Sequence, residues 1–308
     1  MRDIKKMKNS SKIYFVITID TEADHSFNWK KSEPLTFKSI TESIPRTIEP
    51  LFERYGAIGT YLLTAEVLED DGSIKILKGI DKCELGTHLH PEYIEPQKKY
   101  YKYAGTTSSE FSNNCDPMLE MDKISNITKL FQERIGYAPL VYRGGKFGFS
   151  LATARSLSKL GYLIDTSVTP GISWKKIGGP DFRALREQPY FIKNIKDSGD
   201  LLEVPVTIMP MNILEAVFNR ATWLRPSFSS VKEMKQLMGK VIKTRSHYNA
   251  IVLNMMFHSM EFYPGASPYA RSIEDCNNLI SKIEDVLKYC RKIGAEFCKL
   301  SHISTVIK

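Results

Sequence analysis

The sequence predicts an α/β protein in which mostly parallel strands form a barrel. Apolar, β-rich segments alternate with amphipathic segments along the chain, which is typical of a parallel sheet covered by helices. About seven such strand–helix units follow one another in a single run, and this favours a barrel over an open sheet. The length of 308 residues fits one large barrel or two smaller domains. We expect a single domain over residues 1–308.

The expected elements follow from hydrophobic periodicity and from the residues that begin and end helices. Residues 13–19 are continuously apolar, as in a strand buried on both faces. Residues 43–55 place apolar side chains on one helical face, and Gly56 ends that helix. Ser230 and Glu233 form a capping-box pattern at the start of a later helix. The other expected elements are strands at 57–64, 84–90, 140–142, 162–164, 201–209 (broken by Pro205), 250–257 and 296–300, and helices at 74–80, 118–135, 150–160 and 273–293.

Charge and cysteine content limit the compartment and the partners. The net charge of +8 is spread along the chain and would attract anionic partners such as membrane headgroups or acidic glycans. Zinc-finger spacing, an RNA-binding aromatic signature and heptads are all absent, which disfavours nucleic acid. The five cysteines form no CxxC pair, which favours a reducing compartment. The apolar run at 13–19 is too short for a signal peptide or a membrane span, so we expect a soluble cytoplasmic protein.

Two of the six histidines, His88 and His90, stand one residue apart at the end of an expected strand. Residues i and i+2 of a strand point to the same side, so both imidazoles can reach one point from a stiff backbone. A divalent metal ion needs such convergent ligands, about 2.0–2.1 Å away. Two histidines on the exposed face of a strand would have the same spacing, and the rest of the chain has to distinguish the two interpretations.

Polar residues follow the carboxyl ends of several expected strands. These ends meet on one face of a βα barrel, where active sites are built. Each residue also has a structural interpretation, because an Asp can cap the next helix, an Arg can serve an ion pair and a lone His can be a core residue. Their joint occurrence at strand ends favours a shared site. The residues are Asp20, His88, His90, Arg143, Asp165 and His258.

Asp20 and Glu22 have the same i, i+2 relation as the two histidines. One carboxylate that completes a set of two histidines and one carboxylate leaves an open metal position for water. The other carboxylate, beside the ion, can act as the general base on that water. The spacing alone allows either assignment.

From Ile17 to His258 the chain resembles the metal-dependent polysaccharide deacetylases, the group that is similar to chitooligosaccharide deacetylase. This resemblance implies a distorted (β/α)7 TIM-like barrel. The segments HLHP and FHSMEF are also similar to a subgroup tied to bacterial surface-polysaccharide synthesis, by analogy alone. Five segments resemble the family's motifs in the family's order: ITIDTE at 17–22, GTHLH at 86–90, YRGGKF at 142–147, GYLIDTS at 161–167 and MFHSME at 256–261.

The resemblance implies a role for each candidate residue. A divalent ion, with Zn²⁺ preferred, would be held by His88, His90 and a carboxylate, for which Glu22 is the best choice. Asp20 would then be the catalytic base. By the same resemblance, Arg143 would orient that base, His258 would be the general acid and Asp165 would keep this acid protonated.

The chain departs from the family pattern at three places. Asp20-Thr21-Glu22 replaces an adjacent Asp-Asp pair. The segment from His88 to His90 replaces His-x-x-x-His, and Glu92 stands at the spacing of the second histidine. Gly145 replaces a proline in the third motif.

The implied function is a metal-dependent hydrolase that removes acetyl groups from N-acetylated sugars in surface polysaccharide biosynthesis. Two alternatives stay open, a metal-dependent amidohydrolase acting on a small non-sugar molecule and a non-catalytic glycan-binding barrel. The irregular segment from Pro91 to Pro117 has a length typical of functional or disordered loops, and its aromatic content favours order. Its rings could stack on sugar faces or pack the loop against the body of the protein. They belong to Tyr93, Tyr100, Tyr101, Tyr103 and Phe111.

Overall fold

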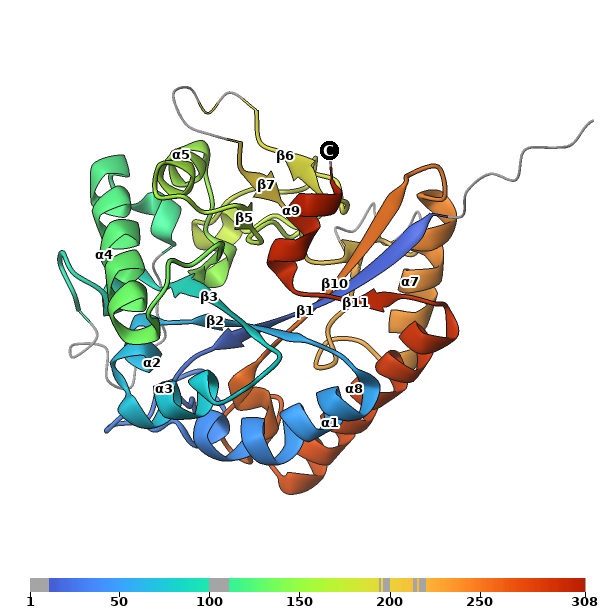
Figure 1. Cartoon of the computed structure of the whole chain (residues 1–308), viewed down its shortest axis with the longest axis horizontal. Coiled ribbons are helices and arrows are strands. Elements are labelled where there is room, and N and C mark those ends of the chain that lie inside the picture. The colour runs from blue at the N-terminus through green and yellow to red at the C-terminus, as the bar shows by residue number, and fades with distance from the viewer. Residues whose placement is uncertain are drawn as a thin grey trace, which may run out of the picture.

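A curled, mostly parallel sheet organises this computed structural model, which describes residues 11–99, 111–193, 195, 200–212, 215 and 220–307. The hydrogen-bonded order is β10-β1-β2-β3-β4-β5-β7-β6, and β11 also pairs with β1 (Figure 1). Strand β6 is antiparallel to β7, and the other pairs in this order are parallel. The predicted α/β barrel of mostly parallel strands is therefore confirmed. The strands are β1 (Lys12–Thr21), β2 (Gly59–Leu63), β3 (Glu84–Leu89), β4 (Val141–Gly144), β5 (Ile164–Asp165), β6 (Tyr190–Phe191), β7 (Leu202–Glu203), β10 (Ala250–His258) and β11 (Glu296–Phe297).

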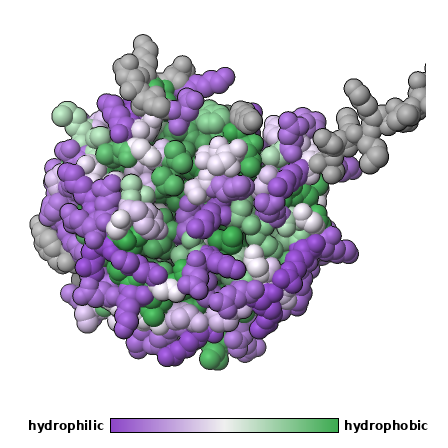
Figure 2. Space-filling model, viewed as in Figure 1, coloured by the Kyte–Doolittle hydropathy of each residue, from purple (hydrophilic) through white to green (hydrophobic). Residues whose placement is uncertain are grey.

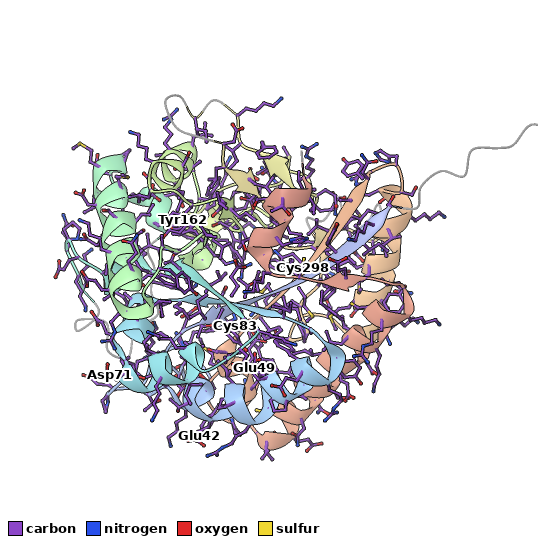
Figure 3. The ribbon with its side chains drawn as sticks, in the orientation of Figure 1. Glu42, Glu49, Asp71, Cys83, Tyr162 and Cys298 are labelled. Atoms are coloured by element: carbon purple, nitrogen blue, oxygen red, sulfur yellow. The ribbon has the colours of Figure 1, made fainter. Side chains whose placement is uncertain are left out.

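Helices surround the sheet and bury its outer face (Figure 1). The side chain of Tyr162 joins the sheet to this helical layer through its hydroxyl group (Figure 3). Its hydroxyl lies 2.9 Å from Thr87 Oγ1 of β3 and 2.8 Å from Thr128 Oγ1 of α4. Figure 2 shows that hydrophilic residues cover most of the face viewed, with hydrophobic residues visible between them. The longer helices are α1 (Glu49–Tyr55), α3 (Asp71–Lys78), α4 (Pro117–Ile135), α5 (Leu151–Lys159), α7 (Val231–Thr244) and α8 (Ile273–Lys292).

Successive side chains of β1 point to opposite faces of the sheet and so contribute to two different cores. Phe15 and Ile17 belong to the outer core beneath the helices, whereas Tyr14 and Val16 belong to the inner core. Two further steps of two residues bring Thr18 and then Asp20 to the inner side. The inner core is apolar near the amino ends of the strands, where the C-terminal segment contributes Leu300 and Ile303, and it becomes polar toward their carboxyl ends.

The strand register brings distant parts of the chain together at the carboxyl ends. In the β1–β10 pair, Asp20 stands opposite His258. In the β3–β4 pair, His88 stands opposite Arg143. Backbone pairing alone thus places these four candidate residues side by side in two pairs.

The chain between β7 and β8 (Ile208–Met209) closes the barrel against β10. Thr207 N donates to Asn254 O at 3.0 Å, and Asn254 N donates to Thr207 Oγ1 at 2.8 Å. Pro205 lacks a backbone donor and separates β7 from β8, as its position predicts. Strand β8 then pairs antiparallel with β9 (Thr222–Trp223) in a second, small sheet.

Several helix and strand boundaries differ from those predicted. The first helix starts as a π-helix, η1 (Ser39–Ile48), and becomes α1 afterwards, because Pro45 inside it cannot donate to the preceding turn. Helix α3 starts earlier than predicted, since the Asp70 side chain accepts from Ser73 N at 2.7 Å. The last strand ends at Phe297, and a 3-10 turn (Leu300–His302) follows. The capping box predicted at Ser230 is confirmed.

No helix among the described residues is both long enough and apolar enough to cross a membrane. All five cysteines lie in the described part of the chain, and they form no disulfide with one another.

Candidate metal centre and active site

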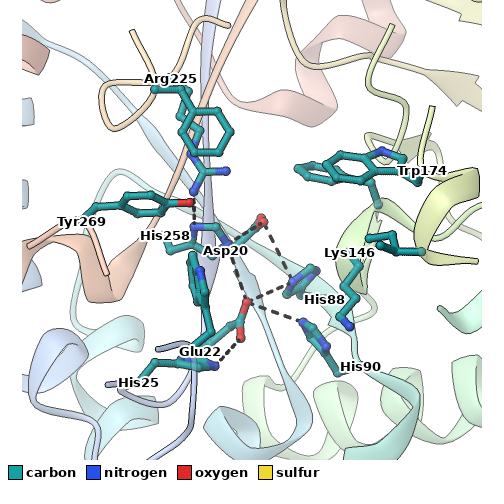
Figure 4. A pocket seen from close by; sticks show the side chains of 14 residues that line it. Asp20, Glu22, His25, His88, His90, Lys146, Trp174, Arg225, His258 and Tyr269 are labelled. Atoms are coloured by element: carbon teal, nitrogen blue, oxygen red, sulfur yellow. Dashed lines mark hydrogen bonds and ion pairs between the residues drawn. The ribbon is translucent and has the colours of Figure 1, made fainter. Parts of the chain in front are cut away.

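A pocket of about 410 Å³ opens at the carboxyl ends of the strands (Figure 4). It joins side chains from β1, β3 and β10 with others from the loops that follow the strands. This position is where a βα barrel places its active site. The lining residues are Asp20, Glu22, His25, Trp29, His88, His90, Lys146, Phe147, Trp174, Ile177, Arg225, Phe228, His258 and Tyr269.

Glu22, His88 and His90 converge on one point in this pocket. Glu22 Oε1 lies 3.4 Å from His88 Nε2 and 3.6 Å from His90 Nε2 (Figure 4). One ligand atom from each of the three residues lies within 4.8 Å of the other two. Two imidazoles and one carboxylate are a donor set typical of catalytic zinc sites with an open coordination position.

The groups behind the two histidines, a hydrogen-bond acceptor for His88 and a nearby carboxylate for His90, fit a bound divalent cation. His88 Nδ1 lies 3.0 Å from Arg143 O, which can only accept, so this nitrogen carries the proton and Nε2 presents a lone pair to Glu22. His90 Nδ1 lies 3.8 Å from Oε1 of the buried Glu92. A partner behind each imidazole is the usual support of a metal-binding histidine. Glu92 therefore lies behind His90 instead of joining the ligand atoms.

The charges of the ligand set also favour a cation. Burial alone would raise the pKa of Glu22, but His90, His88 and Lys31 hold this pKa well below its usual range. Burial alone would lower the pKa of His90, but Glu22 and Glu92 raise it to about 10. The carboxylates thus stabilise positive charge between Glu22 and His90. A divalent ion would compete with a proton for this position.

Asp20 is held ionised and in one orientation by Arg143. Arg143 Nη1 donates to Asp20 Oδ1 at 2.5 Å, its Nε donates to Thr166 O at 2.9 Å, and its Nη2 donates to Thr18 Oγ1 at 2.8 Å. Burial by itself raises the pKa of Asp20, but the guanidinium and the neighbouring histidines lower it below its usual value. The second oxygen, Oδ2, lies 4.0 Å from His88 Nε2 and faces the pocket.

His258 stands on the other side of Asp20, with its Nε2 3.8 Å from Asp20 Oδ2. Its Nδ1 lies 2.9 Å from Glu261 Oε1 and 3.1 Å from Arg225 Nη2. Arg225 Nη2 donates to the same oxygen at 2.8 Å. Trp29 packs edge-on against the His258 ring, with centroids 5.4 Å apart. His258 Nε2 therefore faces the reacting region, while Nδ1 is held between Glu261 and Arg225.

Asp165 does not contact His258, which corrects the expected role of this carboxylate. Its two oxygens accept from Ser167 Oγ at 2.7 Å and from Ser167 N at 3.0 Å. Asp165 stands opposite Glu203 in the β5–β7 pair, and both side chains are fully buried. Asp165 is thus paired with Glu203 of β7 inside the barrel. The carboxylate that contacts His258 Nδ1 belongs to Glu261 instead.

Gly145 explains one departure from the family pattern. A Cβ at this position would lie 2.9 Å from His90 Cγ and 2.7 Å from Leu89 O. Both contacts are closer than real Cβ atoms allow, so a larger residue would push His90 out of place. Glycine at 145 thus fits a second histidine placed two residues after the first.

Several residues that line the pocket or contact its lining lie outside the sequence prediction. Lys31, Trp29 and Arg225 are on loops, where no periodic pattern identifies them. Glu261 could have been identified from the sequence, because it follows His258 by three residues within the same motif. In the structure its Oε1 lies 2.9 Å from His258 Nδ1 and accepts from Arg225.

Two rings of the expected aromatic loop lie among the described residues, and neither lines the pocket. Tyr93 and Phe111 are buried, so they pack against the body of the protein. Tyr100, Tyr101 and Tyr103 lie outside the described residues. The aromatic walls of the pocket come from other segments and consist of Trp29, Phe147, Trp174, Phe228 and Tyr269.

Comparisons with known proteins identify the fold. No family model and no curated protein matches the sequence. Among solved structures, the chain is similar to Puue allantoinase, with 13% identity and a TM-score of 0.58 over 96% of this chain and 89% of that one. It is similar to a probable polysaccharide deacetylase from Pseudomonas aeruginosa PAO1, with 13% identity and a TM-score of 0.56 over 96% of this chain and 89% of that one. At these identities the likeness shows the barrel fold alone.

Proposed function

We propose that this protein is a metal-dependent hydrolase that removes acetyl groups from N-acetylated sugars. The observation that carries the proposal is that Asp20 Oδ2 and His258 Nε2 lie 3.8 Å apart beside the point where Glu22, His88 and His90 converge. A base, an acid and a metal-ligand set around one pocket are the parts that amide hydrolysis needs. The motif resemblance supports this reaction and the sugar as its substrate.

The residues of the chain suit the two proton transfers of the reaction. A divalent ion held by Glu22, His88 and His90 would supply Lewis-acid polarisation of the acetyl carbonyl. Asp20 Oδ2 accepts a proton from the attacking water while Arg143 holds the other oxygen. The new C–O bond forms and the C–N bond breaks, with the proton on His258 Nε2 moving to the leaving nitrogen. The products are acetate and an amino sugar.

The aromatic walls of the pocket support a sugar as the substrate. Trp174 stacks on Phe147 with ring centroids 5.8 Å apart and an interplanar angle of 18°. Trp29 contacts Tyr269 edge-on at 5.4 Å. Flat apolar rings with a few polar groups between them suit the mixed apolar and hydroxylated faces of a pyranose.

One observation favours the second candidate, a metal-dependent amidohydrolase acting on a small non-sugar molecule. The pocket volume of about 410 Å³ is near the lower end of the range for small-molecule sites, about 300–1,000 Å³. Such a volume accommodates a small amide as well as a single sugar unit. The two candidates differ in the amide that they cleave, so substrate choice separates them.

A panel assay tests both candidates. Acetate release would be measured from N-acetylated monosaccharides, oligomers and nucleotide-linked sugars, and ammonia or carboxylate release from small cyclic and linear amides. We expect chelator-sensitive acetate release from at least one N-acetylated sugar. Turnover of a non-acetylated small amide, with none of any sugar, would replace the first candidate by the second.

The biological setting is also part of the proposal. We propose a cytoplasmic role in surface polysaccharide biosynthesis, with Zn²⁺ as the ion. Five cysteines that form no disulfide with one another are typical of a reducing compartment, and the motif resemblance supports the pathway. Cell fractionation and the glycan composition of a deletion strain would test the two parts separately.

A further inference from the structure

The two oxygens of Glu22 face different neighbours. Oε1 faces the imidazoles, at 3.4 Å from His88 Nε2 and 3.6 Å from His90 Nε2. Oε2 faces away from them, at 3.9 Å from Lys31 Nζ and 3.8 Å from His25 Nε2. A carboxylate whose oxygens are divided in this way can offer one oxygen to a cation while the other is held by the protein.

His25 is not the group that holds Oε2 by charge. Its Nδ1 lies 2.9 Å from Ala23 O, which accepts the proton on that nitrogen. The neutral ring therefore presents a lone pair at Nε2. Two lone pairs facing each other do not attract, so the attraction at Glu22 Oε2 comes from Lys31.

Lys31 is a buried cation fixed by three neighbours. Only 7% of its side chain is exposed, and its ammonium donates a hydrogen bond to Glu66 Oε1. It also lies 3.7 Å from the centroid of the Tyr93 ring, a cation–π contact. A buried lysine persists only when it is paired, and these contacts fix its position beside Glu22.

The neighbours of Lys31 come from segments that follow three adjacent strands. Lys31 itself lies in the loop after β1, Glu66 lies in α2 (Ala65–Glu69) after β2, and Tyr93 lies in η2 (Pro91–Tyr93) after β3. Strands β1 and β3 lead directly to the candidate ligands. The ammonium thus connects the loops around the candidate metal centre to one another.

We propose that Lys31 is a positioning residue that holds Glu22 Oε2, so that this carboxylate offers only Oε1 to a divalent cation. The inference rests on the proposed function in taking Glu22, His88 and His90 as the ligands. Binding through one oxygen keeps a coordination position open that a second oxygen would fill. An open position is what separates a catalytic site from a closed structural one.

Cobalt substitution tests this role directly. The double variant Lys31→Met/Glu66→Gln removes the ion pair without changing the net charge. It also keeps similar volumes, a type of replacement that buried pairs often tolerate. With Co²⁺ bound, we expect weaker visible absorption than in the native protein, because a second carboxylate oxygen raises the coordination number. We also expect about 10–100-fold weaker Zn²⁺ binding in competition with a chromophoric chelator. A Co²⁺ spectrum that superimposes on the native one would overturn the proposal.

A matched control separates this effect from general destabilisation. Arg245→Met/Glu187→Gln removes another ion pair, whose Arg245 Nε and Glu187 Oε1 are 2.6 Å apart, without touching the pocket. This control should keep the native Co²⁺ spectrum even with a lower melting temperature. If the Lys31/Glu66 variant does not fold by circular dichroism, Lys31→Gln alone is measured in the same way. A native protein that binds neither Zn²⁺ nor Co²⁺ would contradict the proposed function itself, whereas an unchanged spectrum in a loaded variant contradicts only the role of Lys31.

Discussion

The two sides of the pocket are held in place by different interactions. On the ion-binding side, Glu22 and His88 are almost fully buried, and their neighbours are charged groups and backbone carbonyls from other strands and loops. On the acid side, His258 keeps 13% of its side chain exposed and packs against Trp29. Its polar partner, Glu261, lies only three residues away. The comparison teaches that the ion-binding side depends on long-range pairing of buried charges, while the acid side combines one such pair, Arg225 and Glu261, with a local turn and an aromatic wall.

This difference predicts where substitutions abolish function and where they only weaken it. A buried charged group that loses its partner is left unpaired at a cost of about 3–5 kcal/mol. A group at the edge of the pocket can exchange part of a lost contact for water. We therefore expect substitutions on the ion-binding side to have the larger effects.

The largest effect is expected from removing both metal-ligand histidines. The variant His88→Ala/His90→Ala should lose bound metal and all acetate release, because a single carboxylate cannot retain the ion. Metal content by atomic emission after dialysis is the measurement. His302→Ala, at the opposite end of the barrel, is the matched control and should keep both properties. Stoichiometric metal in the double variant would show that the ion is held elsewhere.

Removal of the acid should have the next largest effect. His258→Ala should keep its metal but turn over about 10²–10⁴-fold more slowly, the usual contribution of general acid–base catalysis. Steady-state acetate release and metal content are measured on the same sample. Full activity in this variant would exclude His258 from the mechanism.

A smaller effect is expected from the residue that orients the acid. Glu261→Gln keeps the size of the side chain but weakens its contacts with His258 and Arg225, so turnover should fall by about 10–100-fold with metal retained. Glu203→Gln, a buried substitution that does not line the pocket, is the control and should keep native turnover. Equal turnover in the two variants would mean that the carboxylate behind His258 has no part in the reaction.

The smallest effect concerns stability and the buried pair of Asp165 and Glu203. Burial and the charge of Asp165 raise the pKa of Glu203 well above its usual value of 4.5. Above pH 4.5 the unfolded chain therefore releases a proton that the folded chain keeps, so stability falls as the pH rises toward the folded pKa. Glu203→Gln carries no such proton, and its melting temperature should fall less between pH 5 and pH 8, by roughly a few degrees. Parallel melting curves for the two proteins across this range would contradict the assignment.

The sequence predicted relations between residues close in the chain better than the contacts of Asp165 with distant parts of the chain. The i, i+2 spacing of Asp20 and Glu22, and of His88 and His90, is a local property of strands, and the structure brings all four side chains to one pocket. The partner of His258 was assigned to Asp165 by resemblance, and that contact is not formed. Asp165 is engaged by Ser167 and Glu203, a pairing that depends on which strand follows β5 in the sheet.

By itself the sequence determined the alternation of strands and helices, the barrel class and the residue types at the strand ends, because all of these depend on periods of a few residues. Only the tertiary structure decided which charge stands behind which ligand. Arg225 reaches Glu261 from 36 positions away, and Lys31 reaches Glu66 from 35 positions away. Such contacts depend on how loops pack after the sheet has closed, and no short-range pattern in the chain records that packing.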